Sequence, residues 1–132
     1  MAGGSINKKA KKILIVDDDA NIVELTRLIM ESAGYQCSVL TRGMECVSHL
    51  EENNNYDLVL LDVAMPSFCG IDVVNALKEK GIFEKQKIAF FTASSAGILE
   101  DSELTKLGVI GLLKKPFSKK NLLERIEVWT SD

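Results

Sequence analysis

The sequence predicts an α/β fold in which helices cover both faces of a parallel sheet, an arrangement described as doubly wound. Short, continuous apolar runs alternate with longer stretches whose apolar residues recur at helical spacing, and this alternation repeats five times. Strands that are apolar throughout are typical of parallel sheets buried on both faces. The chain has 132 residues and 46% of them are hydrophobic, which suits one domain with a substantial core.

The first two strand–helix units precede residue 56. Ile13–Val16 is an apolar run that ends in acids, as a buried parallel strand would, and a weaker strand covers about Gln36–Leu40. The first helix ends at Gly34 and the second at Asn53–Asn55, because glycine and asparagine commonly end helices. The apolar positions at helical spacing are Ile22, Leu25 and Ile29 in the first helix and Met44, Val47 and Leu50 in the second.

Three further units complete the pattern. The remaining strands are expected at Leu58–Leu61, Ile88–Phe91 and Val109–Leu113. The remaining helices are one that carries Val73, Val74 and Leu77 and ends near Gly81, one over Ala96–Leu107 that Gly108 closes, and a last one that Ser118 caps and that buries Leu122, Ile126 and Trp129.

Right-handed crossovers leave few ways to connect five parallel strands. We therefore expect a five-stranded doubly wound sheet with the flavodoxin-like strand order 2-1-3-4-5 and five helices. Residues 1–12, which contain Gly3–Ser5 and several lysines, are expected to form a flexible N-terminal tail. Residues 13–130 are expected to form a single domain.

The overall composition excludes several classes of protein. A net charge of −3 gives no electrostatic reason to expect direct binding to nucleic acid. The three cysteines form no CxxC pair, so reduced thiols are expected rather than a disulfide framework. No apolar run approaches the roughly 20 residues of a membrane span, so we expect no membrane association and a cytoplasmic location.

Polar side chains follow four of the five expected strands. Asp17–Asp19 follow the first strand, Asp62 the third, Thr92 the fourth and Lys114–Pro116 the fifth. In the strand order 2-1-3-4-5 these four strands are neighbours, and their carboxyl ends meet at one edge of the sheet. Acids, a hydroxyl group and a lysine are therefore expected to converge there.

This set of groups suits magnesium-dependent phosphoryl transfer. Clustered carboxylates repel one another unless a cation lies between them, and Mg²⁺ is typically held by one or two carboxylates, water and a phosphate oxygen. A central aspartate can act as the nucleophile, while Lys115 and Thr92 can bind phosphoryl oxygens. Taken singly, each group has a plainer interpretation: an acidic turn with Asp19 as a helix cap, a structural hydroxyl, or a surface lysine.

The same residues resemble the receiver domain of two-component response regulators. The resemblance extends from about Ile13 to Trp129 and covers nearly the whole expected domain. The segments that carry it are Ile13–Asp18, Asp62–Pro66 with Gly70, Phe91–Ala93 and Lys115–Phe117.

The resemblance implies that Asp62 is the phosphoacceptor, with Thr92 and Lys115 binding the phosphoryl oxygens. It also implies that a sensor histidine kinase or histidine phosphotransfer protein donates the phosphoryl group. The surface made by the fourth helix, fifth strand and fifth helix would then switch for an unidentified output domain or effector. Such a protein promotes only its own phosphorylation and dephosphorylation, so it is a signalling phosphoacceptor rather than an enzyme.

The resemblance further implies a set of Mg²⁺ ligands. Asp18 and Asp62 would bind the ion through their carboxylates, Asp17 through water, and Ala64 through its backbone carbonyl. The Lys115–Pro116 peptide bond would be cis, as in the family.

Leu112 departs from the usual pattern of the family, and two further positions are ones where its members vary. Leu112 stands where many receivers place an aromatic residue whose ring moves with the threonine on activation, so that movement is not expected in its usual form. Ala64 and Ser94 occupy positions that tune hydrolysis of the phosphoryl group. Since alanine cannot orient an attacking water, we expect a fairly long-lived phosphoryl state.

Two other functions fit parts of the sequence. A degenerate receiver that only binds partners would have lost acids or the lysine, yet all are present. A magnesium-dependent phosphatase, or another doubly wound enzyme, would need a segment for a substrate pocket that the minimal fold leaves no room for. The only histidine, His49, is expected on the surface of the second helix rather than in a phosphohistidine site.

Overall fold

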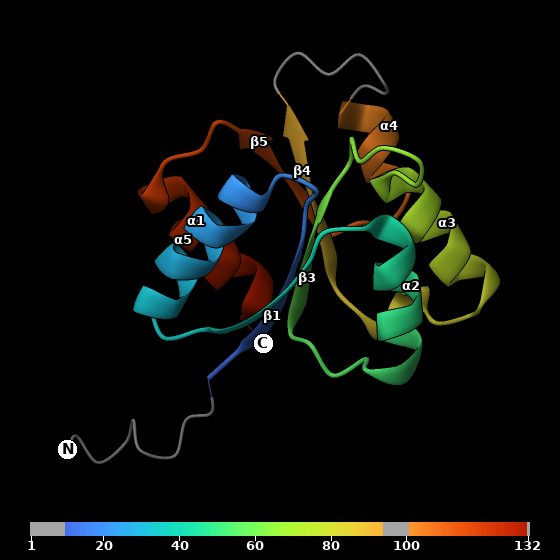
Figure 1. Cartoon of the computed structure of the whole chain (residues 1–132), viewed down its shortest axis with the longest axis horizontal. Coiled ribbons are helices and arrows are strands. Elements are labelled where there is room, and N and C mark those ends of the chain that lie inside the picture. Colours follow the sequence, from blue (N-terminus) through green and yellow to red (C-terminus); the bar gives the residue numbers. More distant parts are fainter. Residues whose placement is uncertain (1–9, 94–100, 132) are drawn as a thin grey trace.

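The computed structural model describes residues 10–93 and 101–131 and shows a three-layered α/β fold (Figure 1). A central parallel sheet contains five strands in the order β2-β1-β3-β4-β5, which confirms the predicted topology. The strands are β1 (Lys12–Val16), β2 (Gln36–Leu40), β3 (Leu58–Asp62), β4 (Ile88–Ala93) and β5 (Gly111–Lys115).

Helices cover both faces of this sheet, with α1 and α5 on one side and α2, α3 and α4 on the other (Figure 1). Within the described residues, none of them has the length and apolarity needed to cross a bilayer. The helices are α1 (Ala20–Ser32), α2 (Gly43–Glu52), α3 (Gly70–Glu79), the short 3₁₀ helix η2 (Phe83–Lys85), α4 (Asp101–Thr105) and α5 (Lys119–Thr130).

The core forms two layers because successive side chains of a strand point to opposite faces of the sheet. In β1, Ile13 and Ile15 pack with buried residues of α1 and α5, whereas Leu14 and Val16 pack with buried residues of α2 and α3. These four apolar side chains of β1 are fully buried. The continuous apolar run in the sequence is thus explained by burial on both faces.

The helix ends largely follow the predicted chemistry. The Asp19 carboxylate accepts hydrogen bonds from the backbone N–H groups of Asn21 and Ile22 and so caps α1, and the Ser118 hydroxyl caps α5 by accepting from Asn121. Gly34 follows α1 with φ at +99°, a conformation that glycine adopts without strain.

The buried face of α1 differs from the one that the apolar pattern suggests. Val23, Thr26 and Met30 are buried, whereas Leu25 is 51% exposed and Leu28 is 54% exposed. Both sets of residues recur at helical spacing, so periodicity predicts the helix without selecting which face meets the sheet.

The fifth strand also differs from its prediction. The apolar run Val109–Leu113 predicted the strand, but β5 pairs from Gly111 to Lys115, with Gly111 beside Ala89 and Lys115 beside Ala93. The strand therefore begins two residues later than the apolar run and continues beyond it into charged residues at its carboxyl end. The 3₁₀ helix η2 was not predicted.

The fourth helix can be compared with its prediction only in part. Of the expected span Ala96–Leu107, the structure describes α4 over Asp101–Thr105, followed by a turn to Gly108 at φ +96°. Residues 94–100 lie outside the described residues.

One glycine and one buried hydroxyl show how tightly the layer of α1 and α5 is packed against the sheet. A Cβ atom at Gly111 would lie 2.5 Å from the Trp129 ring, so only glycine lets α5 approach β5 this closely. On α1, the Thr26 hydroxyl is fully buried and finds no hydrogen-bond partner among the described residues. A buried hydroxyl without a partner destabilises the fold.

Replacing Thr26 by valine should therefore stabilise the protein, since Thr26→Val removes an unsatisfied polar group and keeps the shape of the side chain. We expect the free energy of unfolding, measured by urea denaturation, to rise by about 1 kcal/mol. Thr130→Val is the matched control, because the buried Thr130 hydroxyl donates to the Ile126 carbonyl at 2.7 Å and its loss should destabilise. A destabilised Thr26→Val variant would contradict the interpretation.

Candidate functional site

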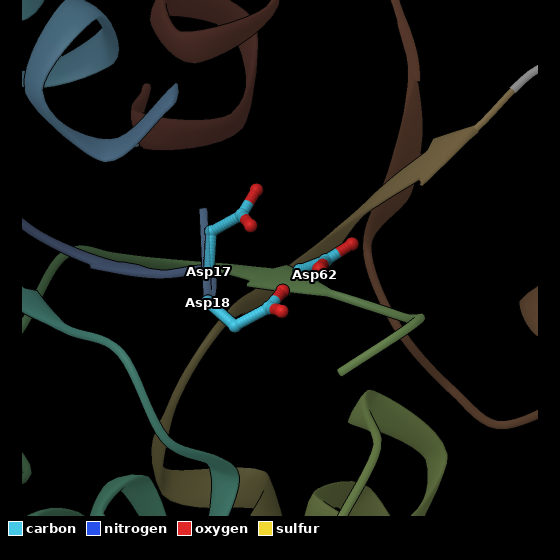
Figure 2. Close-up of side chains that lie close together, drawn as sticks. All are labelled: Asp17, Asp18 and Asp62. Carbon is cyan, nitrogen blue, oxygen red and sulfur yellow. The ribbon is translucent and has the colours of Figure 1, made fainter. Parts of the chain in front are cut away.

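Three carboxylates gather at the carboxyl ends of β1 and β3 (Figure 2). Asp17 and Asp18 directly follow β1, and Asp62 is the last residue of β3. One oxygen atom from each lies within 4.8 Å of the others. Asp17 and Asp62 are buried, whereas Asp18 is exposed, so the cluster opens to solvent on the Asp18 side.

The sheet register explains why these residues meet. β1 and β3 are hydrogen-bonded neighbours, with Val16 opposite Leu61, so the residues that follow emerge side by side. The Asp17 backbone N–H donates to the Leu40 carbonyl of β2, and its carboxylate accepts from the Asp19 backbone N–H at 3.0 Å. These bonds fix Asp17 at the start of the turn into α1.

Lys115, at the end of β5, reaches across to the acids. Its Nζ atom lies 2.5 Å from an oxygen of Asp17 and 3.4 Å from an oxygen of Asp62. Burial alone would lower the pKa of Lys115, but the hydrogen bond to Asp17 and the nearby acidic charges outweigh it and raise the pKa. The lysine is therefore a positive charge at this site over the whole physiological pH range.

Asp62 is electrostatically the most perturbed of the acids. Burial raises its pKa to about 6, and the negative charge of Asp17 adds to the effect. The Lys115 ammonium and the Ala64 backbone N–H, which lies 3.4 Å from the Asp62 carboxylate, oppose the shift without cancelling it. One lysine is thus too little positive charge for the two buried carboxylates.

Thr92 is the next-to-last residue of β4 and is only 3% exposed. Its hydroxyl finds no partner among the residues that the structure describes. Asp62 and Phe91 are paired across β3 and β4, so Thr92 follows the residue beside the central acid. A buried donor without a partner suits a ligand that completes its hydrogen bond.

The donor set fits a magnesium ion. Mg²⁺ prefers oxygen ligands, and the clustered oxygens of Asp17, Asp18 and Asp62 offer them at one exposed edge. Ala64 is exposed and its backbone lies two residues beyond Asp62, where the loop leaves the sheet. Of the residues for which the sequence predicted a metal-binding role, the structure thus brings the three acids together.

The loop after Asp62 is held close to the end of β3. The Gly70 backbone N–H donates to the Val63 carbonyl at 2.9 Å, and a Cβ atom at Gly70 would lie 2.5 Å from the Asp62 carbonyl. Only glycine allows this approach, which explains why the loop returns to the site before α3 begins.

Other predictions for this region have mixed outcomes. The Lys115–Pro116 peptide bond is cis, as the resemblance implied. Leu112 is half-buried on β5 and packs against the core layer that contains Phe90. Ser94 lies outside the described residues. His49, on α2, is half-buried, and its Nε2 atom lies 2.6 Å from the Tyr56 hydroxyl. The contact between Lys115 and the Phe91 ring was not predicted.

This fold and this acidic edge define a receiver domain of two-component signalling. The chain belongs to the response regulator receiver domain family, whose model matches residues 13–127. It is 35% identical over 116 residues to the response regulator SaeR of Staphylococcus aureus (strain USA300), which corresponds to 86% of this chain and 48% of SaeR. The chain thus spans about half the length of the curated relatives it matches.

Solved structures agree with this family. A CheY-like response regulator receiver domain protein from Methanospirillum hungatei JF-1 is 27% identical, with a TM-score of 0.81 over 91% of this chain and 94% of that chain. The receiver domain of sensor histidine kinase PA1611 from Pseudomonas aeruginosa PAO1 shares the fold at 22% identity, with a TM-score of 0.81 over 94% of this chain and 100% of that chain. That structure holds a magnesium ion in its active site cleft.

The raised pKa of Asp62 predicts how stability depends on pH in the absence of divalent metal. The folded protein keeps the proton of the Asp62 carboxyl up to about pH 6, whereas an unfolded chain keeps it only to about pH 4. The folded state is therefore fully stabilised by this proton below about pH 4, and that stabilisation is lost as pH rises through about 6. Asp62→Asn removes this dependence, so its stability relative to wild type should rise by about 2 kcal/mol between pH 4 and 7.

Urea denaturation in the presence of a chelator, repeated across this pH range, measures the difference. A constant difference between Asp62→Asn and wild type at all pH values would show that the pKa of Asp62 is not raised.

Proposed function

We propose that this chain is a phosphoacceptor switch in which Asp62 receives a phosphoryl group from a histidine kinase or a histidine phosphotransfer protein. The observation that carries the proposal is the convergence at a single edge of three acids, one half-buried lysine and one buried hydroxyl that has no partner among the described residues. Residues 13–130 would form the receiver unit and residues 1–12 its tail. The cytoplasm, where such kinases act on their partners, is the proposed location.

In this reaction an Asp62 carboxylate oxygen attacks the phosphorus atom. A new O–P bond forms, the P–N bond to the donor imidazole breaks, and its electron pair returns to the imidazole nitrogen. The phosphoryl group carries its charge on three oxygens, so catalysis depends on cations and on positioning. A bound Mg²⁺ would supply positive charge for one of these oxygens.

The residues of this chain have separate roles in the proposal. Asp18 and Asp62 would hold the ion with their carboxylates, Asp17 through water, and Ala64 through its carbonyl. Lys115 would leave Asp17 for a phosphoryl oxygen, because the dianion attracts the ammonium more strongly than one carboxylate. The Thr92 hydroxyl would donate to another oxygen and so gain the partner that it lacks among the described residues.

Switching then follows from the movement of two side chains. Lys115 ends β5 and Thr92 lies near the end of β4. A shift of either side chain would therefore change the positions of α4, β5 and α5. Such a shift changes the relative populations of two states rather than creating a new one. Leu112 lacks the ring found at this position in many receivers, so Thr92 and Lys115 would carry the change.

The proposal is tested with acetyl phosphate and magnesium chloride, followed by intact-mass measurement. We expect a mass gain of one phosphoryl group that requires magnesium and is absent in Asp62→Asn. Asp57→Asn, at the residue that precedes the opposite end of β3, is the matched control and should be phosphorylated like wild type. No gain in wild type, with donor and magnesium at saturating levels and with a kinase domain as second donor, would favour a receiver that only binds partners.

Thr92→Val separates function from stability. The variant loses a donor to the phosphoryl group, so phosphorylation should slow by about tenfold or more. It also loses an unsatisfied buried hydroxyl, so the free energy of unfolding should rise by about 1 kcal/mol. Rates from the mass assay and stability from urea denaturation check both, and an unstable, slow variant would contradict the role assigned to Thr92.

The lifetime of the phosphoryl group tests the role of Ala64. Since this exposed side chain cannot orient an attacking water, we expect a long-lived phosphoryl state. Loss of the added mass after removal of the donor gives the lifetime, and Ala64→Asn should shorten it. Decay of the wild-type phosphoryl group within seconds would overturn this expectation.

A further inference from the structure

The ammonium group of Lys115 lies over an aromatic ring as well as between two acids. Its Nζ atom is 5.5 Å from the centre of the Phe91 ring, within the range of a cation–π interaction. Asp17 and Asp62 contact the same Nζ atom from their strands. The lysine is thus held from several directions, although a flexible four-carbon chain connects its charge to the backbone.

The Phe91 ring is itself fixed in place. It is fully buried, and the Phe117 ring stacks on it with centres 5.5 Å apart and planes 9° from parallel. The backbone of Phe91 is paired with that of Asp62, and its carbonyl accepts from the Val63 backbone N–H at 3.1 Å. The ring is therefore tied to the same strand end as the central acid.

A ring in this position changes which conformations Lys115 occupies. The lysine side chain is 21% exposed, so solvent offers its ammonium a competing environment. The negative face of a buried ring favours the inward conformation, and this effect is larger when the cation is partly desolvated. The ring thus keeps a positive charge beside Asp62.

We propose that Phe91, with its ring supported by Phe117, is a positioning residue that holds the Lys115 ammonium at the acidic edge. The inference rests on the proposed phosphoacceptor function and identifies a residue that prepares the site for the phosphoryl group. It has two opposite consequences. A well-held ammonium speeds phosphorylation, because it is already placed for a phosphoryl oxygen, and it weakens Mg²⁺ binding, because like charges repel.

The test replaces Phe91 by phenylalanines that carry one, two or three ring fluorines, which weaken the negative face of the ring while keeping its apolar shape. Across the series we expect the phosphorylation rate with acetyl phosphate to fall progressively, by about two- to fivefold in total. The dissociation constant for Mg²⁺, measured by calorimetry without a phosphodonor, should decrease over the same series. Phe91→Leu should lie at the end of both trends and Phe91→Tyr near wild type.

The same fluorinated residues at Phe90 provide the matched control. Phe90 is the preceding residue of β4 and is equally buried, but it packs in the opposite core layer. A role of Phe91 in packing alone would slow phosphorylation and weaken Mg²⁺ binding together, and Phe90 variants would behave alike. That result, or rates and affinities that do not change with fluorination at Phe91, would overturn the proposal.

The two measurements also separate this inference from the proposed function. If wild type is never phosphorylated, the proposed function fails, and the Mg²⁺ affinities alone decide whether the ring holds the lysine. If wild type is phosphorylated and the Phe91 series matches it in both measurements, only the inference about Phe91 fails.

Discussion

The repulsion among three carboxylates at one end of a parallel sheet is the constraint on which the site depends. The sheet order brings Asp17, Asp18 and Asp62 to neighbouring strand ends, and one carboxylate oxygen from each lies within 4.8 Å of the others. Lys115 neutralises part of this charge but lies closer to Asp17 than to Asp62. The central acid keeps a raised pKa, so a further cation would reduce the repulsion that remains at the site.

Two buried hydroxyls show how location decides the meaning of an unsatisfied group. Thr26 and Thr92 are both buried and without a partner among the described residues. Thr26 faces the layer between α1 and the sheet, whose described core residues are apolar and accept no hydrogen bond from its hydroxyl. Thr92 follows Phe91, the residue paired with Asp62, and under the proposed function its hydroxyl would donate to the phosphoryl group. The same unsatisfied group would then be a cost in one place and a prepared contact in the other.

Most of the architecture follows from patterns that the sequence states directly. Fully apolar strands, glycine and asparagine at helix ends, and Asp19 and Ser118 as caps predict the elements and their order, and the order then places the acids at one edge. Patterns that allow two answers are less reliable: α1 has apolar residues on more than one face, and the apolar run at the fifth strand begins and ends two residues earlier than β5 does. The partners of Lys115 depend on side-chain conformation across strands far apart in sequence, which no local pattern records.

The packing of α5 on β5 has a practical consequence. Trp129 is the only tryptophan of the chain, and its ring lies against Gly111, at the start of the strand that ends in Lys115. Any shift of β5 against α5 would change the surroundings of this single indole. Its fluorescence emission is therefore a built-in optical reporter of that interface, and it needs no attached dye.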